Sequence, residues 1–227
     1  MARTLFIGTT NPGKLGEFVA LLGPLGLTVK VARSADEVEE PSTDLLDGFA
    51  ENARIKALAY ARISGGVTLA EDSGLAVAAL GGLPGIYSAR FADVDLAAKK
   101  VLKDSCRPRE VMDPLNNQRL LECMKGFEQP RRAALFRTAA VLATASARAG
   151  RGAEVLFSAT AESHGWIAQE ARGDRGFGYD PVFVGQDTFG KTYAEIDPVR
   201  KNLKSHRKRV MDELFFWLSK HTDVFDR

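Results

Sequence analysis

The run Leu69-Ala70-Glu71-Asp72-Ser73-Gly74-Leu75 places two adjacent carboxylates after a short apolar stretch and directly before a Ser-Gly step. Val67 to Ala70 predicts a buried strand, and the Ser-Gly step predicts a turn that ends it. Carboxylates at a strand end can point into a cleft, where they suit a hard metal ion and the activation of water. The run alone is equally compatible with a turn in which Asp72 or Ser73 bonds to its own backbone.

Strand and helix patterns alternate on both sides of this run. Thr4 to Gly8 predicts a strand, and Asn11 and Pro12 suit the N-cap and first residue of a helix that Gly23-Pro24 ends. The polar stretch from Asp104 to Asn117, with its prolines, predicts a loop. The alternation indicates an α/β fold. Further strands are expected at Leu27 to Ala32, Ala134 to Ala145 and Ala153 to Glu162, and further helices at Phe49 to Ser64 and from Val199 to Trp217.

The chain has 227 residues, of which 45% are hydrophobic, and can form one large domain or two lobes that share a cleft. No apolar run approaches the roughly 20 residues of a membrane-spanning helix, and the first residues lack a signal peptide's apolar core. We therefore expect a cytoplasmic protein without a membrane partner. Cys106 and Cys123 show no CxxC spacing and histidines do not cluster, which argues against a disulfide scaffold and against zinc. Any metal should be a hard ion held by oxygen.

The net charge of +2 is too small to predict a stable nucleic-acid partner, but the charge is unevenly distributed. Acids cluster between Asp36 and Glu51, and bases cluster between Arg200 and Arg209. The two clusters could be the ends of a phosphate site or solvated surface. Within the acidic cluster, Glu39 and Glu40 are solvated by default but could complete an oxygen ligand set for Mg²⁺.

Three further segments carry groups that suit a nucleotide. Thr9-Thr10-Asn11-Pro12-Gly13-Lys14 joins a strand to a helix, and its N–H groups and lysine suit a phosphate, although it lacks the GxxxxGK[ST] pattern. Gly176-Phe177-Gly178-Tyr179-Asp180-Pro181 alternates rings with glycines, which can stack a base. Lys201 and the run Ser205-His206-Arg207 offer donors to a base edge or to a phosphate.

Each of these segments also has a structural interpretation. The first could be a capped helix with a surface lysine, the second a buried aromatic turn, and the third the polar face of the C-terminal helix. Asp197-Pro198 and Ser205 are both possible helix starts. Whether Lys201 and His206 share one regular turn therefore stays open.

Taken in order, the segments resemble the inosine triphosphate pyrophosphatase family, enzymes that hydrolyse non-standard purine nucleoside triphosphates. One matching string would be weak evidence. Several strings in the family's order, over nearly the whole chain, are highly specific and outweigh the structural interpretations. The strings are TTNPGK at Thr9 to Lys14, FAENARIKA at Phe49 to Ala57, AEDSGLAV at Ala70 to Val77, LPGIYSARFA at Leu83 to Ala92, GFGYDPVF at Gly176 to Phe183, KTYAE at Lys191 to Glu195 and SHR at Ser205 to Arg207.

The resemblance implies an elongated α/β fold with a central mixed sheet flanked by helices, and two lobes with a nucleotide cleft between them. Residues 1–227 would form this single domain, and the protein would be a homodimer. The implied reaction is the Mg²⁺-dependent hydrolysis of dITP, ITP or XTP to the monophosphate and pyrophosphate. Water would attack the α-phosphorus, and the reaction would cleanse the nucleotide pool.

The resemblance also implies the roles of individual residues. Asp72 would be the catalytic base or a metal ligand, and Glu39 or Glu40 would be a second metal ligand. Lys14 and the backbone before it would hold phosphates, Ser73 would contact the substrate, and Phe177 would stack the purine. The full set implied for substrate binding is Thr9, Thr10, Asn11, Pro12, Gly13, Lys14, Ser73, Phe177, Gly178, Tyr179, Asp180, Lys201, His206 and Arg207.

Base specificity would follow from the donors in this set. Lys201, His206 and Arg207 would donate to the 6-oxo group of hypoxanthine or xanthine, whereas adenine's amino group would face them without an acceptor. Such a mismatch can discriminate by roughly 10⁴. Guanine also carries a 6-oxo group, so GTP must be rejected at the 2-position, by a residue that the sequence does not identify.

The chain departs from the family pattern in two places, and two other functions stay open. A long spacer separates Glu39-Glu40 from Gly48-Phe49, which leaves the metal-binding glutamate unassigned. Asp104 to Leu115 looks like an insertion, expected to be a disordered surface loop or else a segment that reshapes the dimer contact or the cleft mouth. One alternative is a Maf-like nucleotide pyrophosphatase with another base specificity, against which the SHR and FGYD segments argue. The other is a nucleotide- or RNA-binding module without hydrolysis, against which Glu71 and Asp72 argue.

Overall fold

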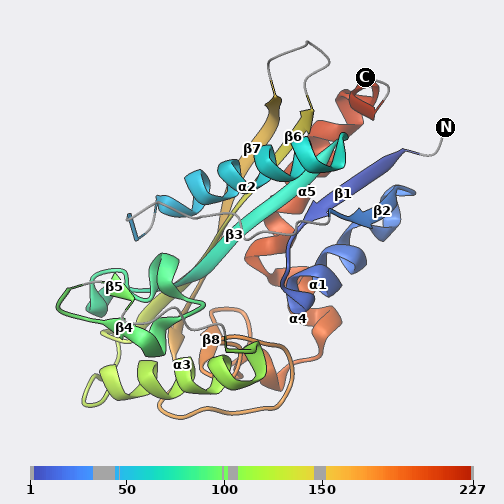
Figure 1. The fold of residues 1–227 in the computed structure, drawn as a ribbon. Coiled ribbons are helices and arrows are strands. Elements are labelled where there is room, and N and C mark those ends of the chain that lie inside the picture. Colours follow the sequence, from blue (N-terminus) through green and yellow to red (C-terminus); the bar gives the residue numbers. More distant parts are fainter. Residues whose placement is uncertain are drawn as a thin grey trace.

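A six-stranded sheet with the order β2-β1-β3-β6-β7-β8 runs through the centre of the molecule (Figure 1). The computed structural model describes residues 3–32, 44–45, 47–98, 100–101, 107–145 and 152–225. The strands of this sheet are β1 (Thr4–Gly8), β2 (Thr28–Val31), β3 (Thr68–Val77), β6 (Ala133–Ala145), β7 (Ala153–Ile167) and β8 (Phe183–Gly185), and β4 (Val94–Asp95) pairs with β5 (Lys100–Val101) in a small second sheet. The helices are α1 (Pro12–Leu22), α2 (Gly48–Ser64), α3 (Arg109–Cys123), α4 (Pro198–Lys204) and α5 (His206–Lys220).

The central sheet is mixed. β1 runs parallel to β2 and β3 on its two sides, whereas β3, β6, β7 and β8 pair in antiparallel fashion. The parallel pairs follow from the long connections that carry α1 and α2, because parallel neighbours cannot be joined by a tight hairpin. The mixed sheet with flanking helices confirms the predicted fold class.

The acid pair lies inside β3, so the predicted strand end at Ala70 is wrong. Glu71, Asp72, Ser73 and Gly74 pair with successive residues of β6, and the antiparallel ladder continues to Val77. The polar residues remain in the strand because β6 satisfies their main-chain groups, which removes the need for a turn. The parallel pairing with β1, in contrast, stops where Gly8 lies opposite Ala70.

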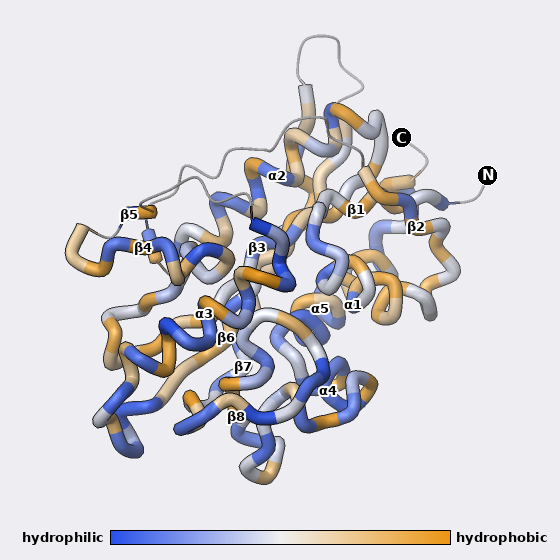
Figure 2. Tube along the Cα trace, turned by 60° about the horizontal axis from the view of Figure 1, so that its bottom comes forward, coloured by the Kyte–Doolittle hydropathy of each residue, from blue (hydrophilic) through white to orange (hydrophobic). Residues whose placement is uncertain are grey.

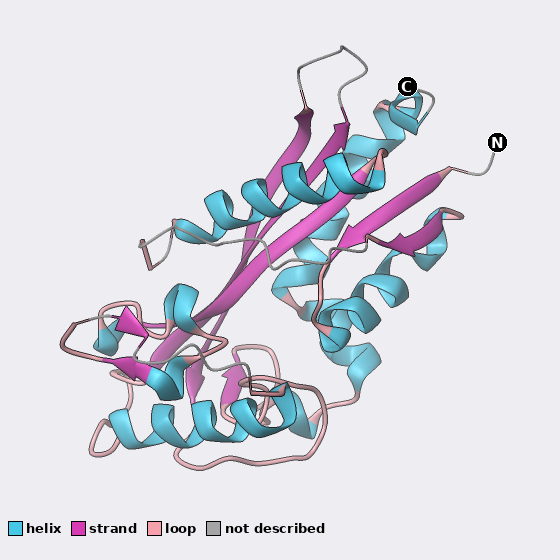
Figure 3. Ribbon diagram, viewed as in Figure 1, coloured by secondary structure: helices cyan, strands magenta, loops and turns pink. Residues whose placement is uncertain are grey.

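Helices cover both faces of the sheet: α2 lies on one face, and α1 and α5 lie on the other (Figures 1 and 3). The predicted stripe of Ala53, Ala57 and Ala61 is buried against small and β-branched residues of β3 and β6. The opposite face packs larger side chains from α1 and α5. Hydrophobic and hydrophilic residues alternate along α2 (Figure 2), as expected for a helix with one buried side. No helix in the described ranges is both long and apolar enough to cross a membrane.

The loop predicted from Asp104 to Asn117 is wrong for its described part, because α3 begins at Arg109 and includes Pro114. Tertiary packing offsets the cost of the proline: Met112 and Leu120 are buried, and Leu120 belongs to a second core under β3 and β6. The remainder of that stretch, before Arg107, lies outside the described residues.

The C-terminal helical pattern also divides into two helices. Asp197 caps α4 and Ser205 caps α5, so both of the possible helix starts are used. Lys201 and His206 therefore lie on different helices.

Gly74 provides a test of how closely the loop after β3 approaches the sheet. A Cβ atom added at Gly74 would lie 2.6 Å from the carbonyl oxygen of Gly85 and would also collide with Ser88. Gly74→Ala should lower the free energy of unfolding by about 1–3 kcal/mol because the backbone must move. Gly23→Ala is the control, since Gly23 has a right-handed φ of −48° and nothing within 4 Å of an added Cβ. Urea denaturation measures both, and equal effects would contradict this packing.

Candidate active site

The two acids of β3 point to opposite faces of the sheet. On the face of α1 and α5, Glu71 lies 2.8 Å from Lys14 Nζ and 3.1 Å from Arg207 Nε, and it accepts a 2.7 Å hydrogen bond from the hydroxyl of Thr138. On the face of α2, Asp72 accepts hydrogen bonds from Lys56 at 2.8 Å and from Asn52 at 3.2 Å. Alternation along a strand requires this separation. The adjacent acids therefore have different partners and different surroundings.

The acids lie where β3 loses its parallel neighbour. After Gly8 the chain leaves the sheet and starts α1, which brings Lys14 to the side of Glu71. Burial is the largest influence on Lys14 and lowers the pKa of its ammonium; Glu71 and Asp72 raise that pKa, and Lys56 lowers it further. The charge of Lys14 therefore interacts with charged side chains on both faces of β3.

The predicted phosphate segment is a capped helix start. The side chain of Asn11 accepts from the N–H groups of Gly13 at 2.9 Å and Lys14 at 3.2 Å, and the N–H of Asn11 donates to Thr9 Oγ1 at 3.2 Å. Pro12 has no N–H group. An anion at this end of α1 would meet Lys14 and the positive end of the helix dipole, while most of the neighbouring N–H groups already have partners.

A chain of buried opposite charges extends from Glu71 to Asp180. Arg207 bridges Glu71 and Glu17, and Lys201 bridges Glu17, at 2.9 Å, and Asp180. Burial would raise the pKa of Glu71, but Lys14 and Arg207 hold it well below the usual value.

The next charges along this chain are fixed in the same way. Burial also opposes ionisation of Glu17, yet Arg207 and Lys201 lower its pKa to about 2. Burial would lower the pKa of Lys201, but Asp180 and Glu17 raise it. These residues stay charged at neutral pH because each meets an opposite charge.

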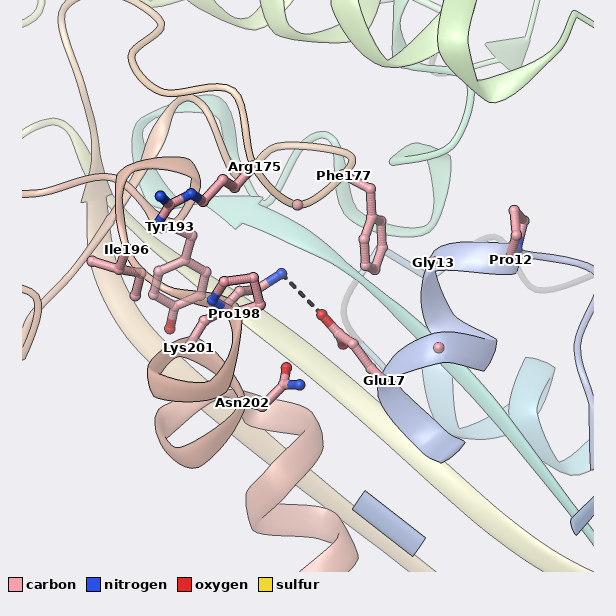
Figure 4. A pocket seen from close by; sticks show the side chains of 12 residues that line it. Pro12, Gly13, Glu17, Arg175, Phe177, Tyr193, Ile196, Pro198, Lys201 and Asn202 are labelled. Carbon is pink, nitrogen blue, oxygen red and sulfur yellow. Dashed lines mark hydrogen bonds and ion pairs between the residues drawn. The ribbon is translucent and has the colours of Figure 1, made fainter. Parts of the chain in front are cut away.

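Phe177 forms one wall of a pocket of about 340 Å³ between the start of α1 and α4 (Figure 4). Its ring packs so closely on Gly13 that an added Cβ would lie 2.7 Å from it. Lys201 Nζ lies 4.9 Å from the ring centroid, and Arg207 Cζ lies 5.7 Å from it. The pocket therefore combines an aromatic surface with buried cations. Its other lining residues are Pro12, Gly16, Glu17, Arg175, Gly176, Tyr193, Ile196, Pro198 and Asn202.

The predicted site residues lie in three different surroundings: the row of buried ion pairs, the second core and the surface. Ser73 accepts a 2.9 Å hydrogen bond from Arg207, and Asp180 accepts from the N–H of Phe177 at 2.9 Å, so both lie within the charged chain. Tyr179 instead points into the second core, where its hydroxyl donates to the carbonyl of Ser88 at 2.9 Å. Thr10 is exposed beside the cap. Tyr179 therefore packs in the second core, next to the residues of the loop, and does not line the pocket.

His206 is a buried imidazole stacked on Phe136, with ring centroids 4.9 Å apart. Neither ring nitrogen has a hydrogen-bond partner among the described residues. Burial, and then Arg207, lower its pKa well below 6.5. The ring is therefore neutral at physiological pH and offers one donor and one acceptor instead of two donors.

The structure describes no complete metal site. Glu39 and Glu40, the predicted second ligands, lie outside the described residues. Within the described ranges, no three His, Cys, Asp or Glu side chains are grouped so that they could hold a metal ion. Asp72 is the predicted ligand that the structure places.

Sequence reasoning missed several residues of this site. Asn52 and Lys56 lie in the string FAENARIKA, and their spacing of four residues puts both on one side of α2, which was an available signal. Glu17 follows Lys14 by one helical turn and offered the same signal. Thr138 and Arg175 carried none, because strand register and loop packing bring them to the site.

Known proteins match this chain over nearly its whole length. Residues 5–217 match the model of the Ham1 family. A dITP/XTP pyrophosphatase of Gloeobacter violaceus is 40% identical over 226 residues, with 100% of both chains covered. A dITP/XTP pyrophosphatase of Streptococcus pyogenes serotype M18 is 37% identical over 224 residues, which cover 96% of this chain and 61% of that protein. The chain thus spans about three fifths of the length of this streptococcal relative.

Two solved structures share the fold. A HAM1 protein from Coxiella burnetii is 32% identical, with a TM-score of 0.74 and coverage of 97% of this chain and 100% of that one. A nucleoside-triphosphatase / dITP/XTP pyrophosphatase from Mycobacterium abscessus is 31% identical, with a TM-score of 0.64 and coverage of 93% and 98%. These matches confirm the resemblance inferred from the ordered strings, and the chain belongs to the Ham1 family.

Proposed function

We propose that the chain is a nucleoside triphosphate pyrophosphatase, a hydrolase of acid anhydrides that converts dITP, ITP or XTP and water to the monophosphate and pyrophosphate. One observation carries the proposal: Lys14 meets Glu71 next to Gly13, which lines the pocket walled by Phe177, and Lys56 meets Asp72 on the other face of the same strand. Cations suit the triphosphate, a carboxylate can activate water, and the ring can stack a base. The names of the relatives supply the substrate class.

The two acids have different roles where the triphosphate would bind. Glu71 has two cations and a hydroxyl as partners and a depressed pKa, so it is a weak base that holds Lys14 and Arg207 in place. Asp72 bonds Lys56 and Asn52 and lies on the other face. An incoming triphosphate can compete for Lys56, which would free an oxygen of Asp72 to accept a proton from the attacking water. Asp72 is therefore the base, and Ser73 stays with Arg207.

Asp72 is a hard oxygen donor that fits a magnesium ion, while the predicted second ligand, Glu39 or Glu40, lies outside the described residues. Mg²⁺ keeps several waters and takes one or two protein carboxylates together with substrate phosphates, so Asp72, with Glu39 or Glu40, is a sufficient protein contribution. When bound, the ion supplies neutralisation of phosphate oxygens and a lower pKa for its water. Lys14 and Lys56 add to that neutralisation from the protein side.

The base end rests on the buried cations. Phe177 stacks the purine, and the cations of Lys201 and Arg207, 4.9 Å and 5.7 Å from its ring centroid, are the nearest charged donors for a 6-oxo group. His206 is neutral, stacks on Phe136 and is not among the residues that line the pocket, so its ring could offer the base a single donor at most. Adenine would place its own amino donor against these donors, which is unfavourable in a buried site.

Several broader features belong to the same proposal. The chain acts as a single domain of two lobes, because β3, β6 and β7 run through both cores. It works in the cytoplasm on the free nucleotide pool, as a homodimer, without a nucleic-acid or membrane partner. These remain predictions from the family resemblance.

A substrate panel tests the reaction and its specificity. With Mg²⁺, pyrophosphate release from dITP, ITP and XTP should be far faster than release from dATP or dGTP, by roughly 10⁴ for the adenine nucleotide. EDTA should abolish release. Equal rates on all purine nucleotides would defeat the specificity, and faster cleavage of modified pyrimidine nucleotides would favour a Maf-like specificity.

Substitution of the two acids separates their roles. Asp72→Asn should lower kcat by about 10²- to 10⁴-fold while nucleotide binding persists, because the variant loses the base but keeps the shape. Glu71→Gln should instead lower the free energy of unfolding by about 3–5 kcal/mol, since Lys14 and Arg207 lose a buried counter-charge. Single-turnover rates and urea denaturation measure the two effects. Substantial activity in the Asp72 variant would place the base elsewhere.

A further inference from the structure

Helix α3 holds the loop that carries Phe177. Asp113 and Asn117, one helical turn apart, contact the same residue of that loop, Gly178. The N–H of Gly178 donates to Asp113 Oδ2 at 2.7 Å, and its carbonyl accepts from Asn117 Nδ2 at 2.9 Å. Both main-chain polar groups of Gly178 are therefore bound by side chains of α3.

The loop conformation depends on these contacts. Gly178 has a φ of +61°, in the left-handed region that favours glycine, so its backbone is free to adopt other conformations when unsupported. Phe177, the preceding residue, donates its N–H to Asp180 at 2.9 Å, and its carbonyl accepts from the N–H of Asp180 at 3.2 Å. The peptide groups on both sides of Phe177 are thus fixed, one by Asp180 and the next by α3.

The two contacts to Gly178 require different chemical groups. Asp113 supplies an acceptor for an N–H group and Asn117 supplies an amide donor for a carbonyl, so the first contact needs an acceptor and the second needs a donor. Asp113 lies in the stretch that looks like an insertion relative to the family pattern, and Asn117 ends the stretch predicted as a loop. Neither residue lines the pocket. The ring of Phe177 reaches the pocket over Gly13 from the loop that they hold.

We propose that Asp113 and Asn117 are positioning residues for base recognition, acting through Gly178 on the ring of Phe177. The proposal rests on the proposed function, in which Phe177 stacks the purine. When the ring is already ordered, binding of a base does not have to include the entropy cost of immobilising the loop. Loss of either contact should weaken the recognition of the base and leave the handling of the triphosphate unchanged.

Asn117→Asp tests this with little change of shape, because it replaces the donor with an oxygen that faces the carbonyl of Gly178. Gln118→Glu is the matched control: it makes the same amide-to-acid change at the next residue, which is exposed and contacts Glu122 instead of the loop. Asp113→Ala removes the other contact, and Asp113→Asn, which keeps an acceptor oxygen, should restore most of its effect.

The readout compares a nucleotide with a base-free substrate. The kcat and KM of pyrophosphate release should be measured for dITP and for deoxyribose 5-triphosphate, which has no base. Asn117→Asp and Asp113→Ala should raise the KM for dITP about tenfold, in the range of a lost base stack, with kcat little changed. The base-free substrate and the Gln118→Glu variant should behave as wild type does. Parallel losses on both substrates would overturn the proposal, as would an unchanged KM for dITP.

Hydrogen exchange of the free protein provides a second measurement that does not require activity. Amide exchange at residues 176–180 should be faster in both disruptive variants, by more than any change in the amides of the central sheet, which report global stability. Unchanged exchange would overturn the role of α3 even in an active enzyme. A wild-type chain that releases no pyrophosphate from any nucleoside triphosphate would overturn the proposed function and the effect on the base, whereas the exchange rates would still decide whether α3 holds the loop.

Discussion

The carboxylate of Glu71, buried in β3 between Lys14 and Arg207, is the interaction on which the rest of the site depends. It connects α1 to α5 through the sheet, and Thr138 of β6 completes its contacts. A charge in this position would be very costly without partners, so the helices must approach in a particular arrangement. That arrangement places Lys14 at the edge of β3 and leaves Asp72 on the opposite face. One structural carboxylate thereby defines the position of Asp72, the proposed base.

The buried ion pairs beyond Glu71 impose the same constraint on the residues around Phe177. Arg207, Glu17, Lys201 and Asp180 alternate in sign, and none of them is well solvated. Removal of one member leaves its neighbour as an uncompensated buried charge, which is more costly than the pair is favourable. The buried ion pairs hold the cations of Lys201 and Arg207 beside Phe177, where the proposed function places the base.

Local sequence patterns predicted much of this molecule for identifiable reasons. The caps at Asn11, Asp197 and Ser205 are local chemistry, since each side chain bonds to N–H groups two or three residues ahead. The alanine stripe of α2 reflects the helical period. Predictions were wrong where long-range packing overrode a local preference: β3 continues through Ser73-Gly74 because β6 pairs with it, and α3 includes Pro114 because its buried face packs on the second core.

The sequence by itself determined the residue types and their order: the ordered strings identified the family, and the helix starts, the alanine stripe and the acid pair could be read directly. It could not determine which acid meets which cation. Lys14 and Glu71, Glu17 and Arg207, and Asp180 and Lys201 are far apart in the chain, and strand alternation and helix packing decide these pairings. The tertiary structure also decided that Glu71 is a fixed counter-charge, that Asp72 faces α2, and that α3 supports Phe177. Local patterns carry no record of contacts between distant segments, because those contacts arise only when the sheet forms.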